Sequence, residues 1–132
     1  MIAFVDTSAL LAVLDRDDRN HIKARRRWES LIEGGATLVC TNYVLLETTT
    51  LLQVRFGLQA VRVFREDVVP LLTIEWVDAE LHQAGVTAVL TAARRKLSLT
   101  DCISFEVMRR LGIRSAFAFD RHYREQGFDD AG

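Results

Sequence analysis

Short apolar runs alternate with longer helix-forming stretches along the chain, and this alternation constrains the fold more than any other feature. Four runs predict strands: Ile2–Val5, Thr37–Cys40, Leu72–Val77 and Arg114–Phe119. Six stretches predict helices: Ser8–Leu14, His21–Ile32, Asn42–Phe56, Leu58–Val69, Asp78–Arg95 and Ser98–Leu111. Strands that are apolar at successive positions are typical of a parallel sheet covered on both faces. The sequence therefore predicts an α/β fold with a short, mostly parallel central sheet and helices on both faces.

Length and composition narrow the class of protein. A chain of 132 residues predicts one domain, spanning residues 1–132, with a hydrophobic core large enough to be stable without disulfide bonds. A net charge of −1 excludes a global attraction to nucleic acids or anionic membranes, so polyanion binding requires a local basic patch. No apolar run approaches the roughly 18 residues of a membrane span. Cys40 and Cys102 lie in apolar runs, without a Cys-x-x-Cys pattern or a secretory leader, which favours reduced thiols in a cytoplasmic protein.

Four acidic residues stand out by their positions. Asp6 and Asp120 each end an apolar run that predicts a strand, in "IAFVD" and "SAFAFD". Ligands of open α/β sheets bind beyond the carboxyl ends of the strands, so these two carboxylates converge if their strands are neighbours. Glu47 shares a helix face with apolar residues, and Asp101 begins a stripe that is also mostly apolar. A charge on a buried stripe is costly unless it is paired or bound to a metal.

Each acid also has a structural explanation. Asp6 and Asp120 can cap the helices that follow them. Asp101 follows Ser98 by three residues, a spacing that approximates a capping box. Glu47 can pair with Arg65 or Arg94. These explanations must be separate for each residue, whereas one site that uses all four acids accounts for the set.

A cluster of carboxylates suits metal-assisted phosphoryl transfer. Mg²⁺ and Mn²⁺ prefer oxygen ligands, and a divalent ion relieves the repulsion among the carboxylates. Such an ion activates water and neutralises charge on the leaving oxygen. The three histidines are scattered and offer no softer cluster: His82 is expected at the surface, and His122 either in a plain loop or as an outer group near Asp120.

Four blocks of sequence, taken together, resemble the PIN-domain family, and most closely its VapC-like toxins. The blocks are "FVDTSALLAVL", "TNYVLLETTTLL", "LSLTDCISFEVMRRLGI" and "AFAFDRHY". The resemblance implies an Mg²⁺- or Mn²⁺-dependent ribonuclease whose acidic positions correspond to Asp6, Glu47, Asp101 and Asp120. Supporting polar residues would be Thr7 or Ser8 near the first acid, and Ser98 and Thr100 before the third. Some members carry a further acid where this chain has His122.

The resemblance also implies protein partners. An antitoxin would block the acidic site with a basic side chain and lay a helix in an apolar groove. Members of the family are commonly homodimers. No membrane partner is implied.

An acidic centre that cuts RNA needs nearby cations to hold the phosphate backbone. The candidates are Lys23, Arg25, Arg26 and Arg27, then Arg94, Arg95 and Lys96, and finally Arg109 with Arg110. For each of these clusters the alternative is a solvated helix face. Trp28 and Trp76 are expected in the core rather than as platforms for bases.

Two other functions fit parts of the pattern. A haloacid-dehalogenase-like phosphatase also places an Asp after its first strand, as part of an Asp-x-Asp pattern. In this chain Ser8 stands where that pattern has its second Asp. A module that binds a partner through its acids without catalysis is the second alternative. Divalent-dependent cleavage of RNA separates the nuclease from the binding module, and release of phosphate from small phosphomonoesters would favour the phosphatase.

Overall fold

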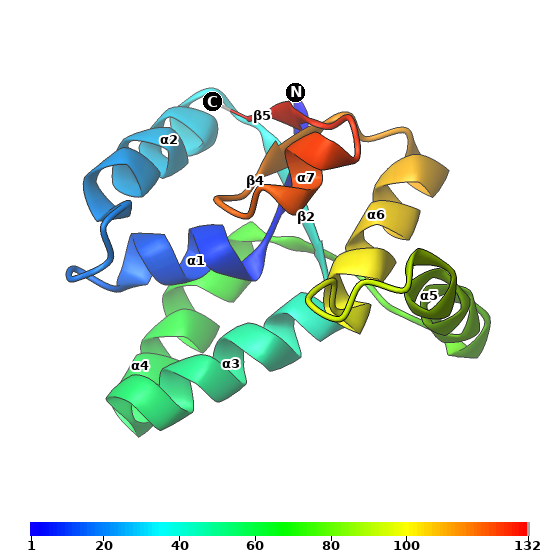
Figure 1. The fold of residues 1–132 in the computed structure, drawn as a ribbon. Coiled ribbons are helices and arrows are strands. Elements are labelled where there is room, and N and C mark those ends of the chain that lie inside the picture. Colours follow the sequence, from blue (N-terminus) through cyan, green and yellow to red (C-terminus); the bar gives the residue numbers. More distant parts are fainter. Residues whose placement is uncertain (132) are drawn as a thin grey trace.

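A five-stranded parallel sheet forms the centre of the molecule, as shown by the computed structural model, which describes residues 1–131 (Figure 1). The strands are β1 (Ile2–Val5), β2 (Thr37–Thr41), β3 (Thr73–Glu75), β4 (Ser115–Phe117) and β5 (Asp129–Asp130). Their order across the sheet is β3-β2-β1-β4-β5, and all four neighbouring pairs are parallel. The predicted α/β fold with a parallel sheet is thus confirmed, and β1 and β4 are neighbours as the convergence of Asp6 and Asp120 requires.

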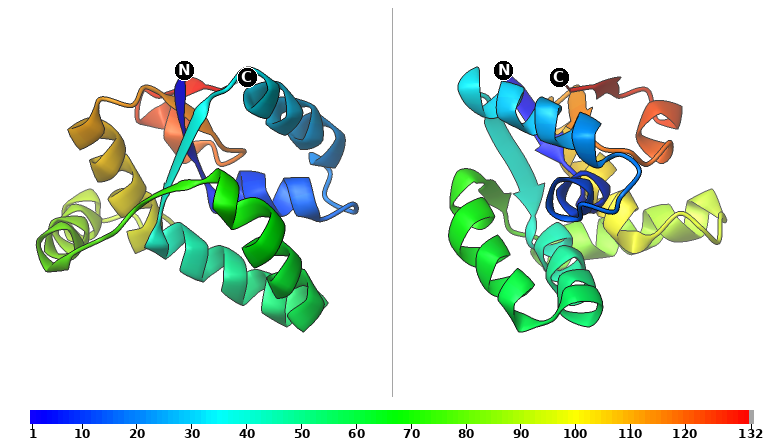
Figure 2. Two further views of the ribbon diagram at one scale, coloured as in Figure 1. Left: turned by 180° about the vertical axis from the view of Figure 1, so that it is seen from behind. Right: turned by 90° about the vertical axis from the view of Figure 1, so that its left-hand side faces the viewer.

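Helices cover both faces of this sheet (Figures 1 and 2). They are α1 (Thr7–Leu14), α2 (His21–Glu33), α3 (Asn42–Phe56), α4 (Leu58–Val63), α5 (Ala79–Ala92), α6 (Leu99–Leu111) and α7 (His122–Glu125). Phe117 of β4 stacks against Trp28 of α2, whereas Phe4 of β1 stacks against Tyr123 of α7, with ring centroids 6.4 Å apart in both pairs. In Figure 1, α1 and α2 lie to the left of the sheet, α5 and α6 to the right, and α3 and α4 below it.

Helix ends follow signals in the sequence. The Thr41 hydroxyl accepts a hydrogen bond from the Val44 amide and starts α3, and Gly57, with φ of 92°, ends it. The Asp78 carboxylate caps α5 in the same way. Gly85 lets α5 approach α6 closely, because a Cβ at this position would lie 2.3 Å from Cδ1 of the buried Ile103. Tight packing of α5 fixes the position of α6, which carries Asp101.

The predicted helix Leu58–Val69 is wrong as a single element. Helix α4 ends at Val63 and is followed by a π-helical turn, Phe64–Val68, and a 3-10 turn, Val69–Leu71. Pro70 has no N–H for an α-helical bond, and its ring would clash with the carbonyl four residues earlier. The chain therefore changes its helical geometry before the proline.

Two further predictions need correction. Arg114–Phe119 is not the last strand, because β4 is shorter and both α7 and β5 follow it. Trp76 is not a core residue: it follows the edge strand β3 and is 70% exposed. Trp28 is half-buried and packs against the core, and both cysteines are buried and free, as expected. Within residues 1–131 no helix combines the length and apolar character needed to cross a membrane.

Candidate active site

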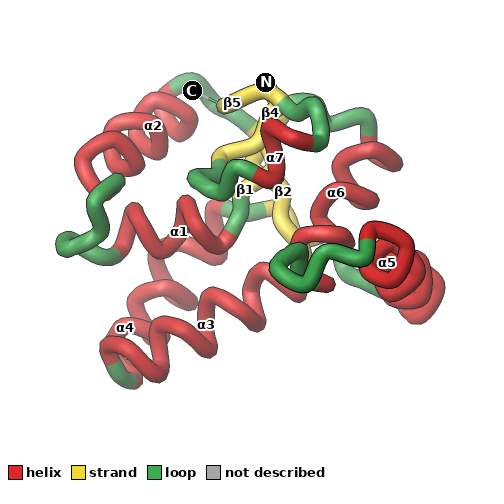
Figure 3. The backbone as a smooth tube through the Cα atoms, viewed as in Figure 1, coloured by secondary structure: helices red, strands yellow, loops and turns green. Residues whose placement is uncertain are grey.

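The carboxyl ends of β1 and β4 meet the N-terminal parts of α3 and α6 at one edge of the sheet (Figure 1). Asp6 directly follows β1, and Asp120 lies in the loop between β4 and α7, coloured green in Figure 3. Glu47 is on α3, and Asp101 is in the first turn of α6. Segments that are far apart in the sequence therefore bring the four acids to a common region.

Asp6 is buried and rigidly held. Its Oδ2 accepts hydrogen bonds from the Ser8 hydroxyl at 2.6 Å and the Ser8 amide at 3.1 Å. Its Oδ1 accepts a hydrogen bond from the Tyr123 hydroxyl at 2.9 Å. Asp6 is thus the N-cap of α1, as the structural explanation proposed. The bond from Tyr123 goes beyond a cap, because it fixes the carboxylate against a residue of α7.

The two polar residues after Asp6 connect the elements of the site. The Ser8 hydroxyl accepts a hydrogen bond from the Phe119 amide at 3.0 Å, which ties the β4–α7 loop to α1. The Thr7 hydroxyl accepts a hydrogen bond from Thr48 of α3 at 3.1 Å and also interacts with the Glu47 carboxylate. Thr7 and Ser8 therefore position different acids.

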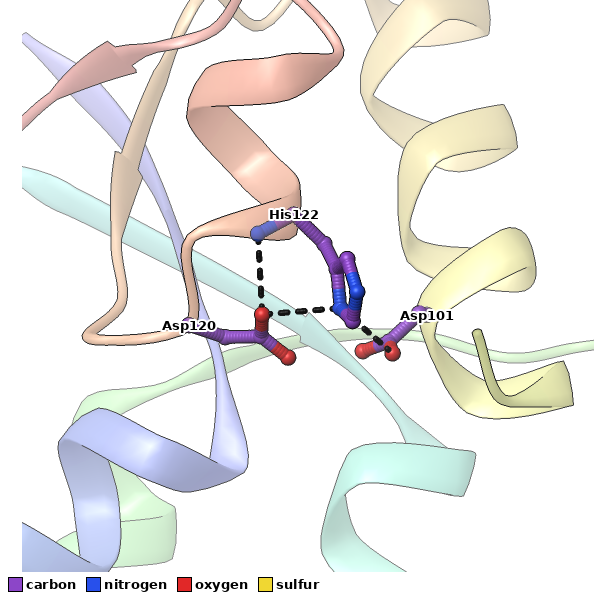
Figure 4. Close-up of side chains that lie close together, drawn as sticks. All are labelled: Asp101, Asp120 and His122. Carbon is purple, nitrogen blue, oxygen red and sulfur yellow. Dashed lines mark hydrogen bonds and ion pairs between the residues drawn. The ribbon is translucent and has the colours of Figure 1, made fainter. Parts of the chain in front are cut away.

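Asp101 and Asp120 lie close to each other around His122 (Figure 4). The Nδ1 atom of His122 is 2.9 Å from Oδ1 of Asp120 and 3.8 Å from Oδ2 of Asp101. One ligand atom from each of the three residues lies within 4.8 Å of the others. Oδ1 of Asp120 also accepts a hydrogen bond from the His122 amide. His122 is buried here, so the expectation of a plain loop histidine is wrong.

Asp101 forms the predicted capping box with Ser98 and is also a member of the cluster. The Ser98 hydroxyl accepts a bond from the Asp101 amide at 3.1 Å, and Oδ2 of Asp101 receives a long return bond of 3.4 Å from the Ser98 amide. The predicted ion pair of Glu47 with Arg65 or Arg94 is wrong. Arg94 pairs with Glu125 of α7, and no ion pair joins Glu47 to a cation anywhere in residues 1–131.

Burial and mutual repulsion disfavour the charged forms of Asp6, Glu47 and Asp101. Burial, together with the charges of Asp6 and Asp120, raises the pKa of Asp101 to about 6. Burial also raises the pKa of Asp6, against hydrogen bonds from Ser8 and Tyr123 that lower it. The pKa of Glu47 is raised by burial and by Asp6, while hydrogen bonds from Thr7 and Thr100 lower it. A divalent cation would relieve the repulsion among these carboxylates, and their oxygen atoms are the ligands that such an ion prefers.

Only part of the predicted basic surface lies at this site. Lys23 and Arg27 line a small polar pocket of about 90 Å³ together with Asp120 and Arg124, and the Arg27 guanidinium lies over the Phe119 ring. Four of the other predicted cations bind neighbouring side chains: Arg25 pairs with Glu29, Arg94 with Glu125 and Arg110 with Glu106, and Arg109 donates a hydrogen bond to Gln126. The remaining three, Arg26, Arg95 and Lys96, are exposed.

Sequence reasoning missed an apolar cleft beside the acids. This cleft, of about 530 Å³, is lined by Tyr43, Leu46, Glu47, Thr50, Leu51, His82, Leu99 and Thr100. His82 is half-buried and bonds the Tyr43 hydroxyl, so its expected surface position is wrong. Tyr123 was also missed, because its contact with Asp6 joins residues at opposite ends of the chain.

Comparisons with known proteins agree with this architecture. The model of the PIN domain family matches residues 3–129. The 23S rRNA-specific endonuclease VapC20 of Mycobacterium tuberculosis is 35% identical over 126 residues, which cover 95% of this chain and 94% of that protein. The crystal structure of VapC20 from M. tuberculosis, described as a sarcin-ricin loop cleaving toxin, superposes with a TM-score of 0.84 at 34% identity, and the match covers 99% of this chain and 98% of that chain. The structure of FitAcB from Neisseria gonorrhoeae shares the fold, with a TM-score of 0.69, 14% identity and coverage of 100% and 97%.

Proposed function

Since this chain belongs to the PIN-domain family and is a VapC-like endoribonuclease toxin, we propose that it hydrolyses RNA at the acidic cluster. The proposed metal-holding residues are Asp6, Glu47, Asp101 and Asp120, and the proposed ion is Mg²⁺ or Mn²⁺. The observation that carries the proposal is the convergence of four acids, of which Asp6 and Asp101 are buried with raised pKa values, without a paired lysine or arginine among the described residues. Because the chain belongs to the PIN-domain family, the alternative of a haloacid-dehalogenase-like phosphatase is excluded.

The residues of the site divide the work of hydrolysis. A divalent ion, when bound by Asp6, Glu47, Asp101 and Asp120, would supply positive charge for the phosphate oxygens and lower the pKa of a bound water. Asp6 is held by Ser8 and Tyr123, so its oxygens are oriented before substrate arrives. Glu47 is less buried than Asp6 and borders the cleft, so its carboxylate is accessible to accept a proton from the attacking water. Attack by water leaves a 5′-phosphate and a 3′-hydroxyl, because the 2′-hydroxyl takes no part.

We propose that the RNA backbone approaches from the α2 side of the site. Lys23 and Arg27 lie one helical turn apart and face the pocket that Asp120 also lines. Their positive charges can hold phosphates next to the cutting centre. The side chain of Arg25 instead pairs with Glu29.

The proposed substrate is a structured loop of 23S ribosomal RNA. The relative named for this specificity aligns over nearly the whole length of both chains. Loops with unstacked bases are the usual targets of specific RNA recognition. We place the activity in the cytoplasm, where ribosomes are available.

Two protein partners are proposed as well. The apolar cleft beside Glu47 suits an antitoxin helix, from which a basic side chain can reach that carboxylate. Exposed apolar side chains on α3 and α5, among them Val54 at 79% and Leu90 at 74%, favour a homodimer. Expression of the chain alone should then arrest growth, and a small protein encoded beside it should relieve the arrest.

The experiment incubates the purified protein with bacterial ribosomes and with total RNA, in Mg²⁺, in Mn²⁺ and in excess EDTA. New 5′ ends are mapped by primer extension. The proposal predicts one dominant cut in a 23S rRNA loop that disappears in EDTA. A dominant cut in another RNA would contradict the substrate but not the nuclease. Absence of cleavage by a folded protein that binds an antitoxin would favour the non-catalytic alternative.

A further inference from the structure

The imidazole of His122 is buried at the acidic cluster with its Nδ1 atom directed toward two carboxylates (Figure 4). The residue is only 9% exposed, and Nδ1 has no hydrogen-bond partner of acceptable geometry within residues 1–131. The backbone of His122 is held on both sides. The His122 amide donates to Asp120, and the His122 carbonyl accepts from the Gln126 amide.

A neutral imidazole nitrogen that presents a lone pair to carboxylate oxygens is repelled by them, and burial increases the cost. A cation between the three groups turns this repulsion into attraction. Two ligands at right angles on an ion with bonds of about 2.1 Å are themselves about 3 Å apart. The separation of 2.9 Å between Nδ1 and Asp120 matches this spacing, and the separation of 3.8 Å between Nδ1 and Asp101 is longer than it.

We propose that His122 is a direct ligand of the divalent ion through Nδ1, beside Asp101 and Asp120, and that it makes the centre prefer Mn²⁺ over Mg²⁺. The inference rests on the metal centre of the proposed function and adds a nitrogen ligand to it. Both ions bind carboxylates and water, but Mg²⁺ is the stricter of the two, because it holds its waters tightly and takes oxygen ligands. Mn²⁺ is a first-row transition-metal ion and accepts an imidazole nitrogen more readily than Mg²⁺ does. An all-carboxylate centre would lack this discrimination.

The test measures the coordination of Mn²⁺ spectroscopically, without RNA. Pulsed electron paramagnetic resonance detects the nuclear coupling of a nitrogen bonded directly to Mn²⁺. We expect this coupling in the wild type and in His21→Asn, a control histidine whose ring contacts the Ala12 carbonyl instead. We expect no coupling in His122→Asn. Calorimetric titration should show Mn²⁺ affinity falling about tenfold or more in His122→Asn, with Mg²⁺ affinity changed by less than about threefold.

The wild-type spectrum tests the inference even if His122→Asn does not fold. Bound Mn²⁺ without nitrogen coupling would overturn it, and would leave an all-oxygen metal-dependent nuclease intact. Equal losses of Mn²⁺ and Mg²⁺ affinity in His122→Asn would overturn the proposed selectivity. Failure of the wild type to bind either ion would contradict both this inference and the metal centre on which it rests. A second variant, His122→Asp, should bind Mn²⁺ without nitrogen coupling and favour Mg²⁺ more than the wild type does.

Discussion

Asp101 belongs to two structures at once, the capping box of α6 and the acidic cluster. The two roles predict opposite effects of Asp101→Asn. Loss of a capping acid costs on the order of 0.5–1 kcal/mol of stability. Removal of one charge from a crowded cluster instead relieves repulsion from Asp6 and Asp120. The return bond from Ser98 is long, at 3.4 Å, so the repulsion should dominate.

We therefore expect Asp101→Asn to leave the metal-free protein as stable as the wild type or more stable. Its stabilisation by Mg²⁺ should be lost, and RNA cleavage should fall by about 10²-fold or more, because an electrostatic group at the reacting phosphate is removed. Thermal melts with and without Mg²⁺ and cleavage assays measure these effects. Asp78→Asn is the matched control, since Asp78 caps α5 outside the cluster. A less stable Asp101→Asn that still responds to Mg²⁺ and cuts RNA would contradict the assignment.

The raised pKa of Asp101 also predicts how stability depends on pH. The folded protein binds this proton more tightly than the unfolded chain, with a pKa of about 6 against 3.8. The contribution is therefore fully present below the unfolded pKa and is lost as pH rises through the folded pKa. In EDTA, the free energy of unfolding should fall across this window by on the order of 3 kcal/mol more in the wild type than in Asp101→Asn. Denaturant titrations at several pH values measure the difference, and parallel curves for the two proteins would contradict it.

Some residues of the candidate site could be predicted and others could not. Asp6, Glu47, Asp101 and Asp120 were recognisable because acids at strand ends or on apolar helix faces need an explanation. Their metal-binding roles stay predictions. For His122 the sequence indicated only a place near Asp120, as one of two alternatives, and Tyr123 gave no such signal. Their contacts with Asp101 and Asp6 depend on how the chain turns after β4, which local sequence patterns do not encode.

Helix α2 presents its basic residues to different surroundings, although they are adjacent in the sequence. Lys23 and Arg27 line the pocket beside Asp120, whereas Arg25 pairs with Glu29 and Arg26 is exposed. The double variant Lys23→Ala/Arg27→Ala should weaken RNA binding by about tenfold or more and reduce its dependence on salt. The control Arg25→Ala/Arg26→Ala removes the same charge and should change binding by less than about threefold. Equal losses in the two variants, measured by filter binding in EDTA, would show a diffuse electrostatic attraction instead.

The contact between α5 and α6 gives a second prediction for these elements. Gly85→Ala would place a methyl group against Ile103, and the resulting overpacking should outweigh the gain in helix propensity. We expect a net loss of about 1–2 kcal/mol in the free energy of unfolding. Ile103→Val removes the nearest atom and should recover part of the loss when combined with Gly85→Ala. Additive losses in this double-mutant cycle would refute the proposed clash.

Elements with strong local signals were predicted well, and short ones were not. The expected helix Asn42–Phe56 matches α3, whose first and last turns are set by Thr41 and Gly57. Helix α7 and strand β5 span only four and two residues, too few for a periodic pattern. The π-helical turn Phe64–Val68 was hidden because it continues the apolar spacing of the preceding helix.

At the scale of the whole molecule, the strand order explains why distant residues form one site. Strands β1 and β4 are neighbours, and the Asp6 amide donates to the Phe117 carbonyl, so Asp6 and the loop that carries Asp120 begin at adjacent points. The alternation of strands and helices predicted a parallel sheet, but not which strands are adjacent. That order depends on long-range packing, which local sequence patterns do not encode.

The central claim is that this cluster cuts RNA with a divalent ion and water. The most direct measurement is the chemistry of the RNA ends produced from one defined 23S rRNA loop, with Mg²⁺ or Mn²⁺ and with EDTA, by the wild type and by Asp6→Asn. We predict 5′-phosphate and 3′-hydroxyl ends from the wild type in the presence of either ion, and no cleavage in EDTA or by Asp6→Asn. Cyclic-phosphate ends, or full cleavage in EDTA, would contradict the account.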